Sequence, residues 1–509
     1  MTSNDMRRRR VAPPPSGVIP RTTQPRATLR IPRPGAAGLQ ALVLRAAYVT
    51  VFWQSLILLP AGCRSYDGDK VRREHVEEYP QTLLARTKEI LDPHQTLGLE
   101  DCIRVAMENN LDARTAAMDK RIARLQRDIA FASFLPTVSV SYSDYEFDPQ
   151  ISLPLSDTQT MNLDNVRSLV WNGSISVFHP ATWFLYGAHR RGEEIADLLG
   201  LYTRQMVAME VTARYFECLT LEQTERSLVA DVEAADALRD DVIAFRKEGL
   251  ASAWQADHAA VNAQARRAEL ARTQRMRRQA NCALLAAMGL SPLAEISLAG
   301  QAPIVPPLGS TEELILEAML NHPSLQIADR RIAIEKEKVK IAISRFLPVL
   351  SAFVYYPDSI ETSLMPSNQW IYGLAGTMTL FDGFANINEY KAARERRKQS
   401  FVAREQTTLT LMLEVIRARQ NLDTAQDQLD LARRARRVAD ARYAEMREKW
   451  KEGLIGSADI LHEAAQRSKS QMQALAAEFQ YQVAAATLLN VMGKTETYTE
   501  DDEHDGQSK

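Results

Sequence analysis

Two pairs of short segments along the chain alternate apolar and polar residues. The first pair occupies 137–147 and 167–178, and the second occupies 349–356 and 370–381. Valine, tyrosine and tryptophan are frequent in these segments, and alternation with a period of two predicts β-strands. Each segment is about 8 to 12 residues long, which is the length with which a tilted strand crosses a bilayer. Taken alone, either pair also fits an ordinary soluble hairpin.

Two much longer segments follow the predicted strands and carry a helical pattern. Neither 181–291 nor 367–509 contains a proline. A helix over 187–248 would be about 90 Å long, whereas helices of globular proteins average about 11 residues. Apolar and small residues recur there at heptad-like spacing, which predicts coiled-coil packing against partner helices. In the second segment these residues are Leu422, Ala425, Leu429, Ala432 and Ala439 on the outgoing helix, and Leu461, Ala465, Ser468, Met472, Leu475, Phe479 and Val483 on the returning helix.

Four short motifs occur twice in the same order, which indicates an internal duplication. The first two pairs are offset by 212 residues and the last two by 204. In chain order the pairs are Met107-Glu108-Asn109 with Met319-Leu320-Asn321, Phe134-Leu135-Pro136 with Phe346-Leu347-Pro348, Glu248-Gly249-Leu250 with Glu452-Gly453-Leu454, and Ala287-Met288-Gly289 with Val491-Met492-Gly493. Each copy is predicted to contain a helix of about 35 residues that ends at Phe-Leu-Pro, because proline stops it, then a strand hairpin, a long helix, a turn and a returning helix.

The ends of the chain differ in composition from the two copies. The first 62 residues are rich in arginine and proline and hold one acid, Asp5, so they cannot bury a core. Ser310 and Glu313 have the spacing of a capping box that opens the second copy. The predicted organisation is a signal and basic, proline-rich leader at 1–62, an N-terminal arm at 63–95, repeat 1 at 96–299, a linker at 300–309, repeat 2 at 310–494 and a disordered acidic tail at 495–509.

The leader ends in an apolar run at 46–59 that is followed by Ala61, Gly62 and Cys63. A basic stretch, an apolar stretch of about 14 residues and small residues at a cut site describe a secretory signal. The last residues resemble the lipobox of bacterial lipoproteins, which implies lipidation of Cys63 with a fatty acid such as palmitate. Pro60 departs from the leucine usual there. The alternative is an uncleaved membrane anchor, which is short for a span of about 20 residues; in both cases the chain is exported.

Composition and motif spacing exclude several functions. The formal net charge of −2 argues against a dedicated nucleic-acid binder. His462-Glu463 lacks a second histidine at the zinc-protease spacing, and no phosphate-binding loop or nucleophile elbow is present. We therefore predict no catalytic residue, no cofactor, no metal site and no enzymatic activity. The remaining cysteines, Cys102, Cys218 and Cys282, are interpreted as buried structural thiols, because their spacing suggests no metal site.

The two halves together resemble the TolC-like outer membrane factors over residues 95–494. The paired Phe-Leu-Pro motifs, the Leu380-Phe381-Asp382-Gly383 step from strand to helix and the Gly-Leu turns carry the resemblance. It implies a mainly α subunit whose four strands join a trimeric, twelve-stranded barrel in the outer membrane, with a helical coiled-coil tunnel in the periplasm. It also implies a homotrimer that meets a periplasmic adaptor protein and an inner-membrane pump. The expected function is a passive, lipid-anchored exit duct for efflux or type I secretion.

The turns between the long helices are the expected docking tips. Gly249 and Gly453 reverse the chain direction, and the resemblance implies that Gly249, Leu250, Gly453 and Leu454 meet the adaptor. From the residues alone, each leucine is either a docking knob or the hydrophobic contact of a Schellman turn.

The resemblance also implies a periplasmic gate shortly after the second tip. Asp459 matches the first of two acidic residues that the family places there, but His462 departs from the second. Three such aspartates around one axis would select cations, and three histidines would reverse this preference as the pH falls. The alternative is that His462 is an ordinary solvated helix residue. A basic latch residue would fall at Ile455 and its acidic partner at Gln255, so the latch is expected to be absent.

A second functional class remains open at this point. A coiled-coil scaffold of the cell envelope would use the same long helices, with the strands forming a small soluble sheet. Such a scaffold needs neither tyrosine and tryptophan in its strands nor matching tips in both copies.

Overall fold

The computed structural model describes most of the chain in two compact units, residues 1–77 and 78–509. The described residues are 67–91, 96–156, 159–300, 304–306, 309–359 and 369–494. The predicted leader at 1–62, the acidic tail at 495–509 and Cys63 therefore lie outside the described residues. The first unit contributes only the beginning of helix α2, and every feature discussed below belongs to the second unit.

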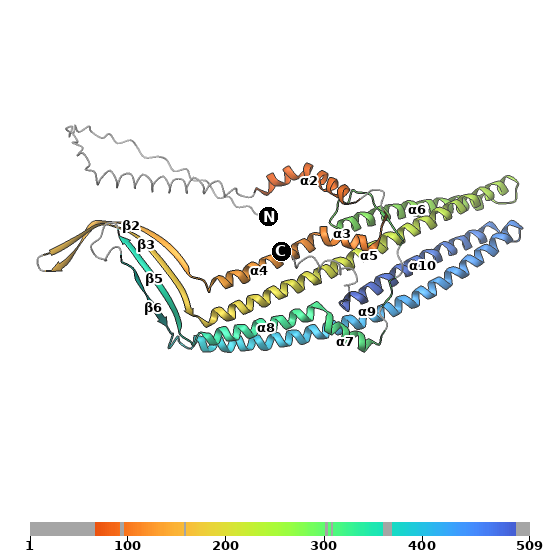
Figure 1. Ribbon diagram of the computed structural model, residues 1–509. Helices are drawn as coiled ribbons and strands as arrows, with labels where there is room; N and C mark the ends of the chain where they lie inside the picture. The colour runs from red at the N-terminus through yellow and green to blue at the C-terminus, as the bar shows by residue number, and fades with distance from the viewer. Residues whose placement is uncertain are drawn as a thin grey trace, which may run out of the picture. The chain divides into compact units, whose positions relative to one another are not determined.

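The order of helices and strands is the same in both halves of the second unit, which confirms the duplicated helix–hairpin–long-helix plan (Figure 1). The elements are α2 (Gly68–Ile90), β1 (Thr96–Leu97), α3 (Leu99–Asn109), α4 (Leu111–Ala132), β2 (Thr137–Ser156), β3 (Gln159–Phe178), α5 (Pro180–Lys247), α6 (Ala253–Ala287), β4 (Ser297–Leu298), α7 (Thr311–Asn321), α8 (Pro323–Ser344), β5 (Val349–Ser359), β6 (Ile371–Thr377), α9 (Ala385–Lys451) and α10 (Ser457–Val491).

The long helices lie side by side, four abreast, both in the half of the protomer near the turns and in the half near the strands. Toward the turns the order is α6, α5, α10, α9, and toward the strands it is α4, α5, α8, α9 (Figure 1). Helices α5 and α9 run the whole way, with 68 and 67 residues. Among the described residues, none of the helices combines the length and the apolar character that a membrane span requires.

The four strands form one antiparallel sheet in the order β2-β3-β5-β6, so β2 and β6 are its edges. Strands β2 and β3 are each 20 residues long, much longer than predicted. The prediction stopped β2 before Pro149, but an edge strand tolerates proline because its outer N–H groups need no partner. Strand β6 is shorter than predicted, because the chain leaves the sheet after Thr377.

The single helix predicted before each Phe-Leu-Pro motif is wrong: each copy has two helices separated by a break. Asn110 ends α3 and caps α4, where its side chain accepts hydrogen bonds from the N–H groups of Asp112 and Ala113 at 2.8 and 3.1 Å. Its side-chain amide also donates to the carbonyl of Ala287, 177 residues away, at 2.8 Å. In the second copy the break falls at His322, where Pro323 begins α8.

The repeated Met-Gly motifs are explained by these breaks. Gly289 has a positive φ of 74° and packs directly on the backbone of Asn109 and Asn110. Gly493 has a φ of 73° and packs on Asn321 in the same way. The two repeated motifs are therefore the two sides of one contact that occurs in each copy. The Met-Gly motif ends the returning helix, and it packs on the motif that ends in asparagine at the helix break.

A hydrophobic core surrounds this contact in the first copy. Tyr215 is fully buried there and its hydroxyl donates to the backbone carbonyl of Ala299 at 2.5 Å. Cys102 and Cys218 lie in the same core, and burial raises the pKa of each thiol to about 12. Cys282 is exposed, so the interpretation of all three as buried thiols is wrong for this residue.

The break at His322 makes part of the stability depend on pH. The imidazole is 7% exposed, and its Nδ1 accepts a hydrogen bond from the N–H of Ser324 at 3.3 Å. Burial lowers the pKa of His322 from its ordinary value of 6.5. The unfolded chain thus binds a proton more readily, so this contribution is complete above about pH 6.5 and declines as the pH falls through that value toward the lower folded pKa.

We expect His322→Asn to reduce the loss of stability between about pH 7.5 and pH 5.5. Asparagine does not titrate, and Asn110 makes the equivalent cap in the first copy. The His322→Asn protein is expected to lose less stability over this interval, because the unaltered unfolded chain takes up a proton at residue 322 and the variant cannot. Thermal unfolding of both proteins at the two pH values measures it, and the titrating carboxylates common to both proteins cancel. Equal losses in the two proteins would contradict the assignment.

Candidate functional site

Both tips between the long helices have the backbone of a Schellman turn. After α5, Gly249 has a φ of 78°, its N–H donates to the carbonyl of Arg246 at 3.1 Å, and the N–H of Leu250 donates to the carbonyl of Phe245 at 2.8 Å. After α9, Gly453 has a φ of 75° and the same pair of hydrogen bonds measures 3.0 and 2.9 Å. Glycine is required at these positions because a Cβ disfavours positive φ.

The leucine side chains at the tips stay in solvent. Leu250 is 73% exposed and Leu454 is 68% exposed. The backbone pattern of the Schellman turn is therefore present, but the hydrophobic contact that often accompanies it does not cover either leucine. Contacts within the protomer therefore do not explain why leucine stands at either position.

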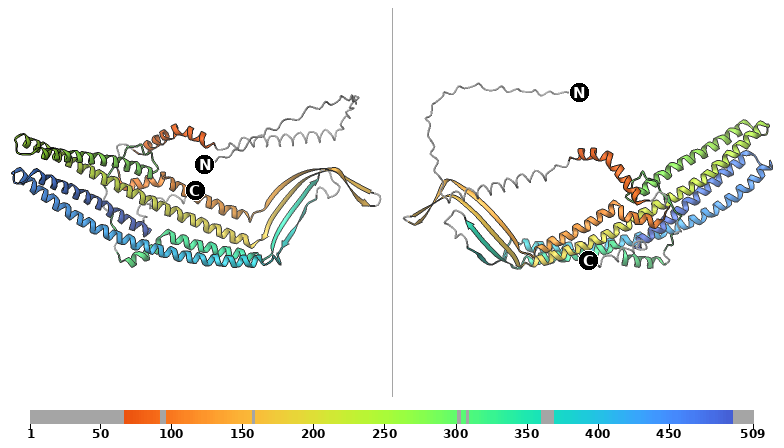
Figure 2. Two further views of the ribbon diagram at one scale, coloured as in Figure 1. Left: turned by 180° about the vertical axis from the view of Figure 1, so that it is seen from behind. Right: turned by 45° about the horizontal axis from the view of Figure 1, so that its top comes forward.

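The two tips are held together, and the three views in Figures 1 and 2 show them side by side. The rings of Phe245 and Trp450 meet edge to face, with centroids 5.9 Å apart. Below them a small core joins α5, α6 and α10, and its buried residues are Leu238, Val242, Ala256, Ala259, Ile460 and Leu461. Both leucines are thus presented on a packed base rather than on independent loops.

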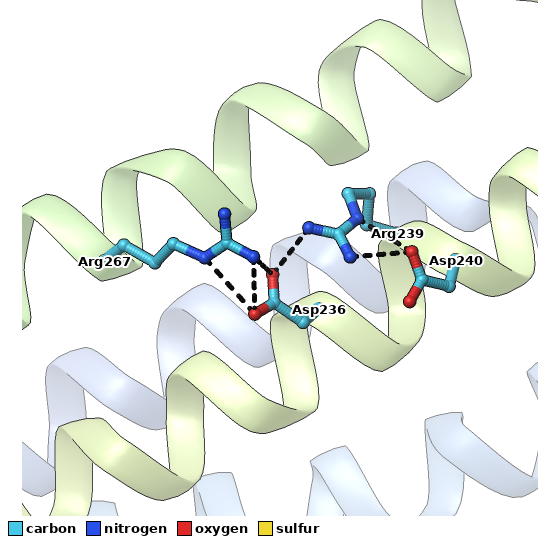
Figure 3. Close-up of polar contacts among 4 residues, drawn as sticks. All are labelled: Asp236, Arg239, Asp240 and Arg267. Carbon is cyan, nitrogen blue, oxygen red and sulfur yellow. Dashed lines mark hydrogen bonds and ion pairs between the residues drawn. The ribbon is translucent and has the colours of Figure 1, made fainter.

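Ion pairs connect each outgoing helix to its returning helix near the tips. Asp236 on α5 accepts two hydrogen bonds from Arg267 on α6, both at 2.8 Å, and another from Arg239 at 2.9 Å (Figure 3). Asp440, at the equivalent place on α9, accepts from Arg467 and Gln471 at 2.9 and 3.1 Å. These groups are partly exposed, so each pair is screened by solvent and contributes modestly. Their effect is to hold the two helices of each hairpin in register.

Asp459 and His462 lie on one exposed face of α10, about one helical turn apart. The Asp459 carboxylate accepts a hydrogen bond from the N–H of Gly456 at 3.1 Å and so caps the helix. In the first copy the equivalent residue, Gln255, accepts from the N–H of Ser252 at 2.7 Å. Asp459 therefore has a local capping role that sequence comparison with a family motif did not reveal.

The duplication also relates His462 to a histidine in the first copy, an equivalence that the sequence analysis did not use. His258 on α6 is offset by 204 from His462, and both are exposed. Trp254, one turn before His258, is 60% exposed, and the two ring centroids are 6.4 Å apart. Applying the repeat offset to every candidate residue would have found this pair.

The described residues contain no group of three or more His, Cys, Asp or Glu side chains placed to hold a metal ion. The candidate site consists of two surfaces, the exposed tips and the polar face of α10 that carries Asp459 and His462.

Comparison with known proteins finds one matching family model, over the second half of the chain. The model of the family described as outer membrane efflux protein matches residues 314–494. No curated protein matches the sequence.

Several solved structures share the fold of this chain. CusC, described as forming a transmembrane channel, aligns with a TM-score of 0.67 at 18% identity and covers 79% of this chain and 95% of its own. The CmeC outer membrane channel of Campylobacter jejuni aligns with a TM-score of 0.66 at 17% identity over 79% of this chain and 88% of its own. The outer membrane protein VceC of Vibrio cholerae gives 0.65 at 16% identity, covering 78% and 96%.

Proposed function

We propose, from the premise that this chain is a TolC-like outer membrane factor, that three copies form the outer-membrane duct of a tripartite efflux or type I secretion system. The duct is passive: it provides a water-filled path, and an inner-membrane pump supplies the energy. A periplasmic adaptor connects the two. Acylation of Cys63 would add a lipid anchor in the outer membrane, and the intact mass of the mature protein measures it.

The observation that carries this proposal is a protomer with two different edges, each made of one edge strand and the outermost long helices. Strand β2 and helices α4 and α6 form one edge, and β6 and α9 form the other (Figure 1). Different edges on one subunit join head to tail, which closes a ring when the rotation permits. The number three comes from the family, in which three four-stranded sheets make a twelve-stranded barrel.

Exposed apolar residues follow both edges, as a ring of copies requires. They recur at heptad-like spacing on the outward faces of α4 and α9, where a neighbouring helix would cover them. On α4 they are Met118, Ile122, Leu125 and Ile129, and on α9 they are Leu409, Leu413, Leu431 and Val438. The edge strands β2 and β6 also need a neighbouring strand in lipid, because unpaired backbone N–H and C=O groups are not tolerated there.

Native mass and conductance test the proposal directly. Protein purified in detergent is expected to have three times the protomer mass and to open pores in planar bilayers. The competing coiled-coil scaffold would extract without detergent and show no conductance. A monomeric or non-conducting purified protein would contradict the duct.

We further propose that Asp459 and His462 line the narrow periplasmic aperture. Three aspartates near one axis favour cations, whereas protonated histidines oppose them. The cation preference is therefore expected to decline or reverse as the pH falls. Single-channel reversal potentials at about pH 5 and pH 8 measure this change, with His462→Asn as the control that should abolish it. Unchanged reversal potential and conductance would leave His462 as a solvated helix residue.

A further inference from the structure

Phe384, immediately before α9, has an unusual backbone conformation. Its φ is 69° and its ψ is 12°, and it is the one non-glycine residue with positive φ in the described part of the chain. The left-handed region is strained for a bulky side chain. Such strain persists only where other interactions maintain it, so the contacts of the ring decide what Phe384 does.

The protomer gives the Phe384 ring little to pack against. It is 61% exposed, and its aromatic neighbour Phe381 is itself 74% exposed, with centroids 5.4 Å apart. The helix start is already capped by Asp382, whose carboxylate accepts from the N–H of Asn386 at 2.8 Å. A glycine at position 384 would satisfy the same backbone without strain. The ring therefore has no sufficient partner within its own copy.

The first copy shows that this junction need not be strained. By the offset of 204, Pro180 is the equivalent of Phe384, and there β3 leads into α5 without a left-handed residue. That junction is internal, because β3 and α5 have neighbours on both sides. The strained and exposed version occurs where β6 and α9 form the free edge of the protomer.

The opposite edge carries apolar side chains at the same level. Phe131, in the last turn of α4, and Leu135, between α4 and β2, are 49% and 52% exposed. The Phe134 ring lies between them in the chain and meets Phe131 at 5.8 Å and Trp183 at 5.1 Å. Phe131 and Leu135 are at the same level as Phe384 because both groups lie beside the same end of the sheet. At that end β2 and β5 begin and β3 and β6 finish.

We propose that Phe384, together with Leu380 and Phe381, packs against Phe131 and Leu135 of a neighbouring copy. This inference rests on the proposed ring of copies and names the contact that closes it where strands become helices. The bound neighbour buries the ring and so compensates the left-handed backbone. In a ring of three the contact occurs three times, just where the sheet edges must remain paired.

Substitution of Phe384 with glycine tests the contact without adding strain. In Phe384→Gly the protomer keeps its backbone conformation, so we expect normal folding but dissociation of the trimer at a clearly lower temperature in detergent. Leu293→Ser is the matched control, because Leu293 is 73% exposed and lies in the segment between α6 and β4 rather than in an edge strand or an edge helix. Its trimer is expected to dissociate at the temperature of the unaltered protein.

Disulfide cross-linking gives a second, independent readout. In a Cys282→Ser background, Leu135→Cys combined with Phe384→Cys is expected to yield covalent dimers and trimers on oxidation, whereas either cysteine alone is not. If the unaltered protein is no oligomer, the proposed function itself fails. If it is a trimer but Phe384→Gly dissociates normally and no cross-link forms, only the contact fails. Quenching of Phe384→Trp fluorescence by brominated phospholipid would show that the ring faces lipid instead, which also overturns the contact.

Discussion

Replacing Gly289 with alanine is expected to destabilise the protein by about 2 to 5 kcal/mol, from about 1 to 2 for the left-handed backbone and about 1 to 3 for overpacking. Gly289 has a φ of 74°, and a Cβ there would lie 2.6 Å from the carbonyl carbon of Asn109 and 2.9 Å from the nitrogen of Asn110. Neither atom can move easily, because the Asn110 side chain caps α4 and also binds Ala287. Thermal unfolding followed by far-ultraviolet circular dichroism measures the change.

Alanine substitutions at two other glycines separate the stability lost through positive φ from the stability lost through a steric clash of the added Cβ. Gly249 has a φ of 78° with nothing near its missing Cβ, and Gly493 has a φ of 73° with the carbonyl oxygen of Asn321 at 3.2 Å. The Gly249→Ala protein should lose only about 1 to 2 kcal/mol, and the Gly493→Ala protein should fall between the other two. Equal losses in the three proteins would mean that the close packing at Gly289 contributes nothing beyond its φ.

On the function proposed above, replacing both tip leucines with serine is expected to abolish export while leaving the proposed trimeric duct intact. Leu250 and Leu454 are 73% and 68% exposed, so the change removes little packing within the protomer. Burying a leucine contributes about 1.5 to 3 kcal/mol, and a trimer presents two at each of its three copies. Losing all of them is therefore expected to weaken adaptor docking by more than about a thousandfold.

Complementation of a deletion strain measures this loss as failure to restore export. The purified double variant should still be a trimer with unaltered conductance, which separates docking from assembly. Leu320→Ser is the matched control, since Leu320 is 76% exposed on α7 and away from the tips. Export restored to the unaltered level by the double variant would rule out the leucines as docking residues.

For the candidate site, the sequence predicted the backbone turns but not the exposure of the side chains that follow them. Gly249 and Gly453 were identified as turns from local chemistry, and both have positive φ. Whether the following leucines were buried depended on neighbouring segments, and the structure leaves them exposed. The gate residues Asp459 and His462 came from the family resemblance, and their role in an aperture remains a prediction. The capping bond from Gly456 to Asp459 was within reach of sequence reasoning, because its spacing is that of Ser310 and Glu313.

The sequence by itself determined the duplicated plan, the long helices, the four strands, the tip turns and the resemblance to outer membrane factors, because these depend on periodicity, proline and glycine within short windows. Only the tertiary structure decided the breaks at Asn110 and His322, the length of β2, the exposure of Cys282 and the backbone of Phe384. Each of these depends on contacts between distant segments or on position at an edge: the amide of Asn110 binds Ala287, 177 residues away, and β2 tolerates proline only because one side of it is unpaired. Local pattern specifies which elements form, whereas the neighbours that they acquire in space set where those elements break and which side chains they leave open.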